Sequence, residues 1–343
     1  MSDLNSISNQ FFDRREAMRP TFRTWLKHFL LLLLTLCTAT AAGTIEPFGS
    51  LRIFPDANPQ TSAEIIQFLF SLPFLYAQLI AEIIHTLAAH PDQLFYGLKF
   101  SVSLLAILTA HEAGHYVACR LYGVDATLPF FIPTPPLIGP AGTLGAFIKI
   151  LSPMPSRRAT FDIGVAGPIA GFVVLIFVAV LGFLTMHNVA LSADANLSDG
   201  IYFSDHLLLK SLAPLFGINL NLPIAPNPFY MAAWVGLLVT SLNLIPSGQL
   251  DGGHAVYAIF GERIHKWTGR IAFVAMGTIS ILGWFLYNSP SGLLFTILLG
   301  VMMRVGHPEP YDDAPLGFKR LIVAVLTLLI FALCFVPFPI QIK

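Results

Sequence analysis

Long apolar runs recur along the chain, and short segments that hold most of its charges separate them. A helix needs about 20 apolar residues to cross the hydrocarbon core of a membrane. Transmembrane helices are predicted over Phe29–Ile45, Leu94–Ala118, Phe161–Met186, Phe229–Ile245, Ile271–Tyr287, Gly292–Met303 and Leu321–Val336. The pattern therefore predicts an all-α polytopic membrane protein with about seven spans.

The first apolar run has two readings. Ala39-Thr40-Ala41 resembles a signal-peptidase cleavage site, but the long positive leader before the run favours an uncleaved membrane anchor. We therefore expect a cytosolic N-terminal segment over residues 1–28 and a single transmembrane domain over residues 29–343.

Positive residues set the expected orientation, because Lys and Arg favour the cytosolic side. They gather before the first run, after the second, between the fourth and fifth and before the last. The connection between His187 and Pro228 carries three aspartates and a single lysine, Lys210, which suits the opposite side. The N-terminus is thus expected in the cytosol and the C-terminus outside it.

The apolar segment Ser62–Ala89 tests this scheme, since a span there would reverse everything after it. Its polar residues fall within about 60° of one another on a helical wheel. A narrow polar stripe suits a helix that lies in the membrane interface, and it also suits a span that lines a wet groove. The charge pattern favours a non-crossing amphipathic helix, which is a candidate for lining or gating a water route.

Composition narrows the class of protein. The chain is 55% hydrophobic and 11% charged, against roughly 25% charged in soluble domains. Zero net charge gives no reason to expect nucleic acid as a partner. The three cysteines are scattered, so neither a disulfide framework nor a thiolate zinc site is supported.

Ionisable residues interrupt the second apolar run at His111-Glu112-Ala113-Gly114-His115. Such groups are costly at membrane depth and point to function. On a helix the two histidines, four positions apart, project from one face and can share a metal ion, whereas Glu112 is rotated about 100° away. This H-E-x-x-H spacing is typical of zinc proteases, in which the glutamate is the general base.

A tetrahedral zinc ion held by two histidines and a water lacks one protein ligand. Asp251 is the best candidate, in the stretch Asn243-Leu-Ile-Pro-Ser-Gly-Gln-Leu-Asp251-Gly-Gly-His254. Pro246 ends the preceding helix, and the glycines allow a sharp turn that could bring the short carboxylate to a metal. The alternative is that Asp251 caps a helix from His254 onward.

These two stretches resemble the signatures of the site-2 proteases, which are intramembrane zinc metalloproteases. The family pattern is H-E-x-x-H in one core helix and N-P-x-P-x-x-x-L-D-G in another; here Leu244 replaces the first proline. The resemblance covers residues 94–254. It implies one zinc ion per chain on His111, His115 and Asp251, with Glu112 as base and Asn243 stabilising the oxyanion. The PDZ and nucleotide-sensing domains of some relatives are not expected.

The resemblance also bears on the connecting stretches. Thr143–Leu151 is rich in β-forming residues, and similar stretches in the family form a membrane-associated β-hairpin near the active site. Its edge could bind an unwound substrate by strand addition, or the stretch could be an interfacial loop. Gly167-Pro168-Ile169-Ala170-Gly171 is expected to let the third span pack closely on the metal-bearing helix.

The predicted function is hydrolysis of membrane-anchored substrates within or near the bilayer, as in regulated intramembrane proteolysis. Substrates would be single-span membrane proteins or signal peptides. The alternatives are an intramembrane metal transporter, for which the other spans contain too few carboxylates, and an inactive protease-like scaffold. The chain is expected to be a multi-pass protein of the cell membrane, with a bacterial cytoplasmic membrane preferred over a plastid one.

Overall fold

Each apolar run that was predicted to span forms a helix. The computed structural model describes residues 19–49, 61–136, 140–188, 201–222, 224–225, 227–289, 291–304, 311–312 and 314–342. The helices at the predicted runs are α2 (Phe22–Thr44), α4 (Pro91–Leu121), α5 (Arg157–Thr185), α7 (Pro228–Asn243), α9 (Glu262–Tyr287), α10 (Ser291–Met302) and α11 (Phe318–Cys334).

The predicted count of seven spans is not confirmed. Five described helices are long and apolar enough to cross a membrane, namely α2, α4, α5, α9 and α3 (Ser62–Ala89). The helices α7, α10 and α11 have 16, 12 and 17 residues. The helix α7 is short because Asn227 accepts hydrogen bonds from its first N–H groups and a turn around Pro246 follows its end.

The first helix begins earlier than its apolar run, at Phe22 rather than Phe29. The Thr21 hydroxyl accepts a hydrogen bond from the Thr24 N–H and so starts the helix ahead of Lys27 and His28. The expected N-terminal segment therefore ends within a helix, and its residues 1–18 lie outside the described part of the chain.

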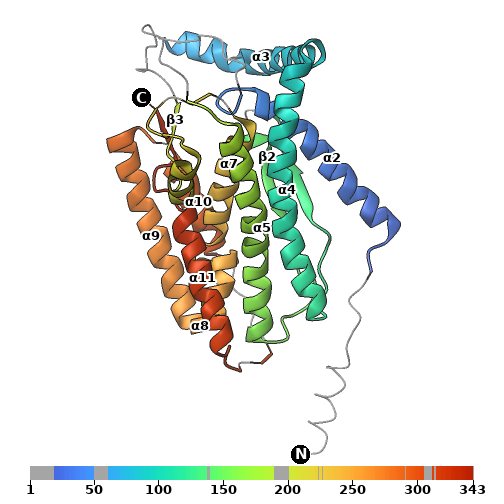
Figure 1. Ribbon diagram of the computed structural model, residues 1–343, viewed down its shortest axis with the longest axis vertical. Coiled ribbons are helices and arrows are strands. Elements are labelled where there is room, and N and C mark those ends of the chain that lie inside the picture. Colours follow the sequence, from blue (N-terminus) through green and yellow to red (C-terminus); the bar gives the residue numbers. More distant parts are fainter. Residues whose placement is uncertain are drawn as a thin grey trace, which may run out of the picture.

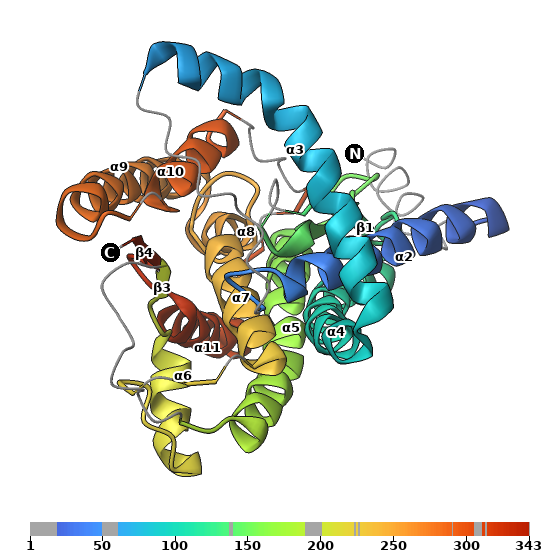
Figure 2. The same cartoon turned by 90° about the horizontal axis from the view of Figure 1, so that it is seen from above.

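The helix α5 lies at the centre of the bundle (Figures 1 and 2) and packs against α4, α7 and α8 (Asp251–Phe260). The main core lies where α4, α5 and α7 meet, and its fully buried side chains include Phe100, Leu104, Leu175 and Trp234. Burial on three sides explains why α5 is apolar around most of its circumference.

The helix α3 has a different direction from the bundle. In Figure 1 it lies across the top of the molecule, while α4 and α5 run from top to bottom. Figure 2, seen from above, shows α3 along its length. Only Leu79 and Ile83 of α3 are buried, and its other apolar side chains are exposed or half-buried. This direction agrees with a helix in the interface, although its length and composition alone would permit a crossing.

The predicted β-hairpin is present. The strands β1 (Phe130–Pro133) and β2 (Thr143–Phe147) pair antiparallel, with Phe130 opposite Phe147, and the short 3₁₀ helix η1 (Pro140–Gly142) precedes β2. The buried His28 of α2 donates from Nδ1 to the Pro129 carbonyl at 2.8 Å. The hairpin is thus fixed against α2, beside α4.

A second small sheet was not predicted. The strands β3 (Ile201–Phe203) and β4 (Ile340–Ile342) pair antiparallel near α6 (Leu207–Leu212) and η2 (Ala213–Phe216), at the end of the bundle where α7 begins. The Trp234 Nε1–H donates to the Ser204 carbonyl at 3.0 Å and fixes this connection to α7. Burial, and then the charge of Lys210, lower the pKa of His206 to about 3, so its imidazole is neutral at pH 7.

Candidate metal centre

Three potential metal ligands meet inside the bundle. His111 and His115 lie on one face of α4, and their Nε2 atoms are 3.1 Å apart. Asp251, the first residue of α8, places one carboxylate oxygen 3.2 Å from His111 Nε2 and the other 3.3 Å from His115 Nε2. Both imidazoles are buried, with exposed fractions of 5% and 7%. The residues that the sequence predicted as ligands therefore lie together.

The donor set fits a zinc ion. Zinc–nitrogen bonds of about 2.0–2.1 Å in a tetrahedron place neighbouring ligand atoms roughly 3.3 Å apart, close to the distances above. The His115 Nδ1–H donates to the Ile163 carbonyl at 2.7 Å, which leaves Nε2 of this ring with the lone pair that a metal needs. Two imidazole nitrogens and a carboxylate are ligands that zinc commonly takes.

Asp251 is not a helix cap. The helix α8 begins at this residue, its N-cap is Leu250, and no side chain caps it. The turn before it depends on glycine: Gly248 has φ +55°, and a Cβ at Gly252 would lie 2.0 Å from the Leu244 carbonyl oxygen. This tight turn brings the short carboxylate to the imidazoles.

Glu112 and Asn243 lie next to the three potential ligands but are not among them. The Glu112 carboxylate is buried, its Oε1 lies 3.9 Å from His111 Nε2, and the Ile148 N–H donates to it. The amide of Asn243, the last residue of α7, lies with Nδ2 3.4 Å from His111 Nε2. Both side chains are thus within reach of a small molecule held at the centre.

Glycines of α5 make room for the imidazoles. A Cβ added at Gly167 would lie 2.1 Å from His115 Nε2, and one added at Gly171 would lie 3.0 Å from His111 Cβ. The expected close packing at Gly167–Gly171 is therefore present. This packing matters for the metal centre, because the imidazole rings occupy the space that a methyl group at either glycine would fill.

A cavity of about 680 Å³ opens beside the centre. Its lining includes the end of β2 and the segment after it, from Ala146 to Met154, together with Asn243 and His254. Among the described residues, none from α3 lines this cavity. The helix α3 lies across the opposite end of α4, and its role in lining or gating a water route stays a prediction.

Two supporting contacts were not predicted. One is the Ile163 carbonyl that holds His115. The other is the buried His265 of α9, whose Nε2–H donates to the Gly248 carbonyl at 2.9 Å in the turn before Asp251. Neither has a local sequence signature, since each joins positions 17 or more residues apart.

His265→Phe is expected to destabilise the protein by about 1–3 kcal/mol, because it removes the donor from a buried carbonyl. Thermal unfolding in detergent measures this loss. His265→Gln keeps an N–H donor and should lose less. A larger loss in His265→Gln than in His265→Phe would instead assign the effect to the ring contact with Tyr257, at 5.7 Å between centroids, which Phe keeps and Gln removes.

The comparisons with known proteins agree with this geometry. A family model described as Peptidase family M50 matches residues 99–284, just over half of the chain. The chain belongs to peptidase family M50. The matched stretch of this M50 chain includes all five candidate site residues, and the resemblance to the site-2 proteases is confirmed.

Several curated relatives of this M50 chain are named as probable chloroplastic zinc metalloproteases. EGY1 of Oryza sativa subsp. japonica is 28% identical over 94% of this chain and 53% of its own length. EGY1 of Arabidopsis thaliana is 30% identical over 68% and 42%. EGY2 of Oryza sativa subsp. indica is 31% identical over 54% and 33%. The M50 chain thus spans about half the length of these relatives or less.

These relatives also bear on the other expectations. Their names give no support to a metal transporter or an inactive scaffold. The preference for a bacterial membrane is not supported either, because the relatives are chloroplastic plant proteins. The M50 chain is a multi-pass membrane protein.

Proposed function

We propose that this chain is an intramembrane zinc metallopeptidase that hydrolyses peptide bonds of membrane-anchored proteins. One zinc ion per chain is held by His111, His115 and Asp251. The observation that carries the proposal is the convergence of these ligands inside a membrane-spanning bundle. The position of His111 on α4 puts the reaction about 15 Å from the helix end at Leu121, at a rise of 1.5 Å per residue.

The chemistry divides among few groups. Zinc supplies a Lewis acid that lowers the pKa of water from about 16 towards 7. Glu112 accepts the proton of the attacking water and passes it to the leaving amine. Glu112 and Ile148, whose N–H contacts this carboxylate, both line the cavity. The Asn243 amide offers an N–H donor to the negative charge that develops on the substrate carbonyl oxygen.

The substrate binds as an extended strand beside β2. A peptide bond inside a helix is shielded by its own hydrogen bonds, so the substrate must unwind before cleavage. The strand β2 pairs with β1 on one edge, and Ala146 and Phe147 line the cavity. Strand addition there would replace the backbone hydrogen bonds that the substrate loses on unwinding. Single-span proteins and signal peptides are substrates of this shape.

The charges favour a site near the cytosolic side. Arg157 and Arg158 begin α5, and Arg320 lies in the first turn of α11 at the same end of the bundle. This arrangement supports a cytosolic location for that end. The helix α3 then lies in the opposite interface without crossing.

Zinc analysis together with a cleavage assay tests the proposed function. The protein, purified in detergent and returned to lipid vesicles, should contain one zinc ion per chain and cut a single-span test substrate within its apolar segment. A chelator should stop cleavage, and added zinc should restore it. Zinc flux across the vesicles without cleavage would overturn the proposal in favour of a transporter.

Asp251→Ala is expected to weaken zinc binding by more than about 100-fold, because even groups that only support a ligand contribute 10- to 100-fold. Competition with a chromogenic chelator measures the affinity. Asp92→Ala is the matched control, since Asp92 is exposed in the first turn of α4, far along the helix from the histidines. Unchanged zinc affinity in Asp251→Ala would remove this carboxylate from the centre.

A further inference from the structure

The metal centre depends on two separate pieces of the chain. His111 and His115 belong to α4, whereas Asp251 begins α8, more than 130 residues later. The helix α5 packs against both of these helices. The separation of the imidazoles from the carboxylate therefore depends on how α5 holds each partner.

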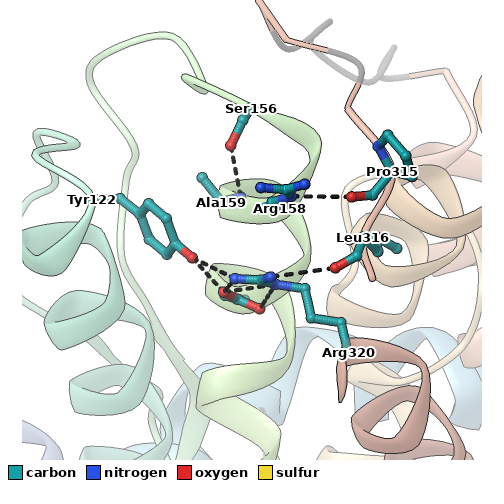
Figure 3. Close-up of polar contacts among 8 residues, drawn as sticks. Tyr122, Ser156, Arg158, Ala159, Pro315, Leu316 and Arg320 are labelled. Atoms are coloured by element: carbon teal, nitrogen blue, oxygen red, sulfur yellow. Dashed lines mark hydrogen bonds and ion pairs between the residues drawn. The ribbon is translucent and has the colours of Figure 1, made fainter. Parts of the chain in front are cut away.

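The start of α5 holds α4 by a charged network (Figure 3). The Asp162 carboxylate pairs with Arg320 of α11, with Nε–Oδ1 at 2.9 Å and Nη2–Oδ2 at 2.7 Å. The hydroxyl of Tyr122, the C-cap of α4, also donates to Asp162 and accepts from Arg320 Nη2 at 3.1 Å. Paired, charge-assisted bonds of this kind fix geometry as well as adding energy.

This network lies next to a contact of the metal centre itself. Ile163 follows Asp162 directly, and its carbonyl accepts the hydrogen bond from His115 Nδ1. A shift of the Asp162 backbone would therefore move the carbonyl that orients a ligand ring. The direction of that ring decides where Nε2 points.

The first turn of α5 holds α8. Arg157 donates from Nε to the Ala258 carbonyl at 3.0 Å and from Nη2 to the Ile259 carbonyl at 3.1 Å. These carbonyls belong to the last turn of α8, where carbonyls lack partners within the helix. Because α8 has only ten residues, fixing its last turn also fixes Asp251 at its start.

We infer that Arg157 and Asp162 are positioning residues that set the distance between the histidine pair and Asp251. This inference rests on the proposed function, because it concerns the same metal centre. Asp162 positions His115 through the end of α4 and the Ile163 carbonyl, and Arg157 positions Asp251 through α8. Arg320 supports Asp162 from α11 and so joins the C-terminal helix to the metal centre.

The test compares Arg157→Gln and Asp162→Asn with Arg158→Gln as the matched control. Arg158 lies on the same turn as Arg157, but its Nε donates to the Pro315 carbonyl, which belongs to neither α4 nor α8. The readouts are zinc affinity by chelator competition, the visible spectrum of the cobalt(II)-substituted protein, and kcat and KM for a single-span substrate. The cobalt spectrum reports the geometry of the ligands, which a purely structural role would leave unchanged.

Arg157→Gln and Asp162→Asn should each weaken zinc binding roughly 10-fold, the lower end of the effect of groups that orient a ligand. Their cobalt spectra should differ from that of the unchanged protein, and kcat should fall while KM stays constant. Arg158→Gln should match the unchanged protein in all three readouts. Tyr122→Phe keeps the ion pair between Asp162 and Arg320 and should shift the same readouts by a smaller amount. This variant provides the test if the other two fail to fold.

Lower thermal stability with unchanged zinc affinity and cobalt spectrum would overturn the inference, because the network would then only hold the fold together. The proposed function is judged separately, by cleavage in the unchanged protein. A protein that binds zinc and cleaves nothing would refute the peptidase, while the order of zinc affinities would still decide the positioning role. Absence of zinc binding in the unchanged protein would overturn both.

Discussion

Glu112→Gln protein will bind zinc as tightly as the unchanged protein and will fail to cleave a single-span substrate. The carboxylate lies outside the ligand group, with Oε1 3.9 Å from His111 Nε2, so its loss leaves the three ligands in place. Glutamine has nearly the same volume but cannot take a proton from water. A positioned base contributes about 10²–10⁴-fold to the rate, and the rate should fall by that factor or more.

The measurement pairs zinc content with initial cleavage rates in lipid vesicles. Glu82→Gln is the matched control, because Glu82 is exposed on α3 at the other end of the molecule, and this variant should cleave normally. Cleavage retained in Glu112→Gln would remove Glu112 from the reaction. Zinc lost along with cleavage would instead show that the glutamate helps to hold the metal.

The sequence could predict those parts of the metal centre that depend on residue spacing within one helix or on the number of ligands that zinc needs. Four-residue spacing on a helix puts His111 and His115 on one face whatever the rest of the chain does. Asp251 follows from a chemical need, since two histidines leave a tetrahedral zinc ion one protein ligand short. The structure brings these three residues together, with ligand atoms within 4.8 Å of one another.

The parts that could not be predicted depend on contacts between distant segments. Arg157 and Arg320 looked like cytosolic flanking charges, yet each bonds a helix that lies far along the chain. The sheet of β3 and β4 has strands of only three residues, too short to show an alternating pattern. The polar stripe of α3 likewise leaves its direction open, and the contact of Leu79 and Ile83 with Ile45 joins segments more than 30 residues apart.

The ends of helices also differ from the ends of the apolar runs that predicted them. The predicted start at Phe29 rests on hydropathy alone. The helix instead starts at Phe22, where the Thr21 side chain accepts a hydrogen bond from a backbone N–H that lacks a partner within the helix. In α7 the reverse holds, because Asn227 and the turn at Pro246 confine an apolar run to 16 residues. The number of membrane crossings therefore cannot be counted from apolar runs alone.

Gly167→Ala is expected to abolish both zinc binding and cleavage. The added methyl group would lie 2.1 Å from His115 Nε2 and 2.3 Å from Cδ2 of the same ring, well inside van der Waals contact. The ring cannot yield freely, because Nδ1 is bonded to the Ile163 carbonyl and Nε2 faces Asp251 at 3.3 Å. Relief requires either a turned imidazole or a wider gap between α4 and α5, and each displaces a ligand.

Zinc affinity should fall by more than about 100-fold in this variant, beyond the effect of losing a supporting group, while overpacking costs about 1–3 kcal/mol of stability. Chelator competition and thermal unfolding in detergent measure the two effects separately. Gly277→Ala on α9 is the control, since a Cβ there meets only Thr296 Cγ2 at 3.7 Å and should leave zinc affinity unchanged. Normal zinc affinity in Gly167→Ala would mean that α4 and α5 can separate without moving a ligand, and the close packing of α5 would then have no part in building the centre.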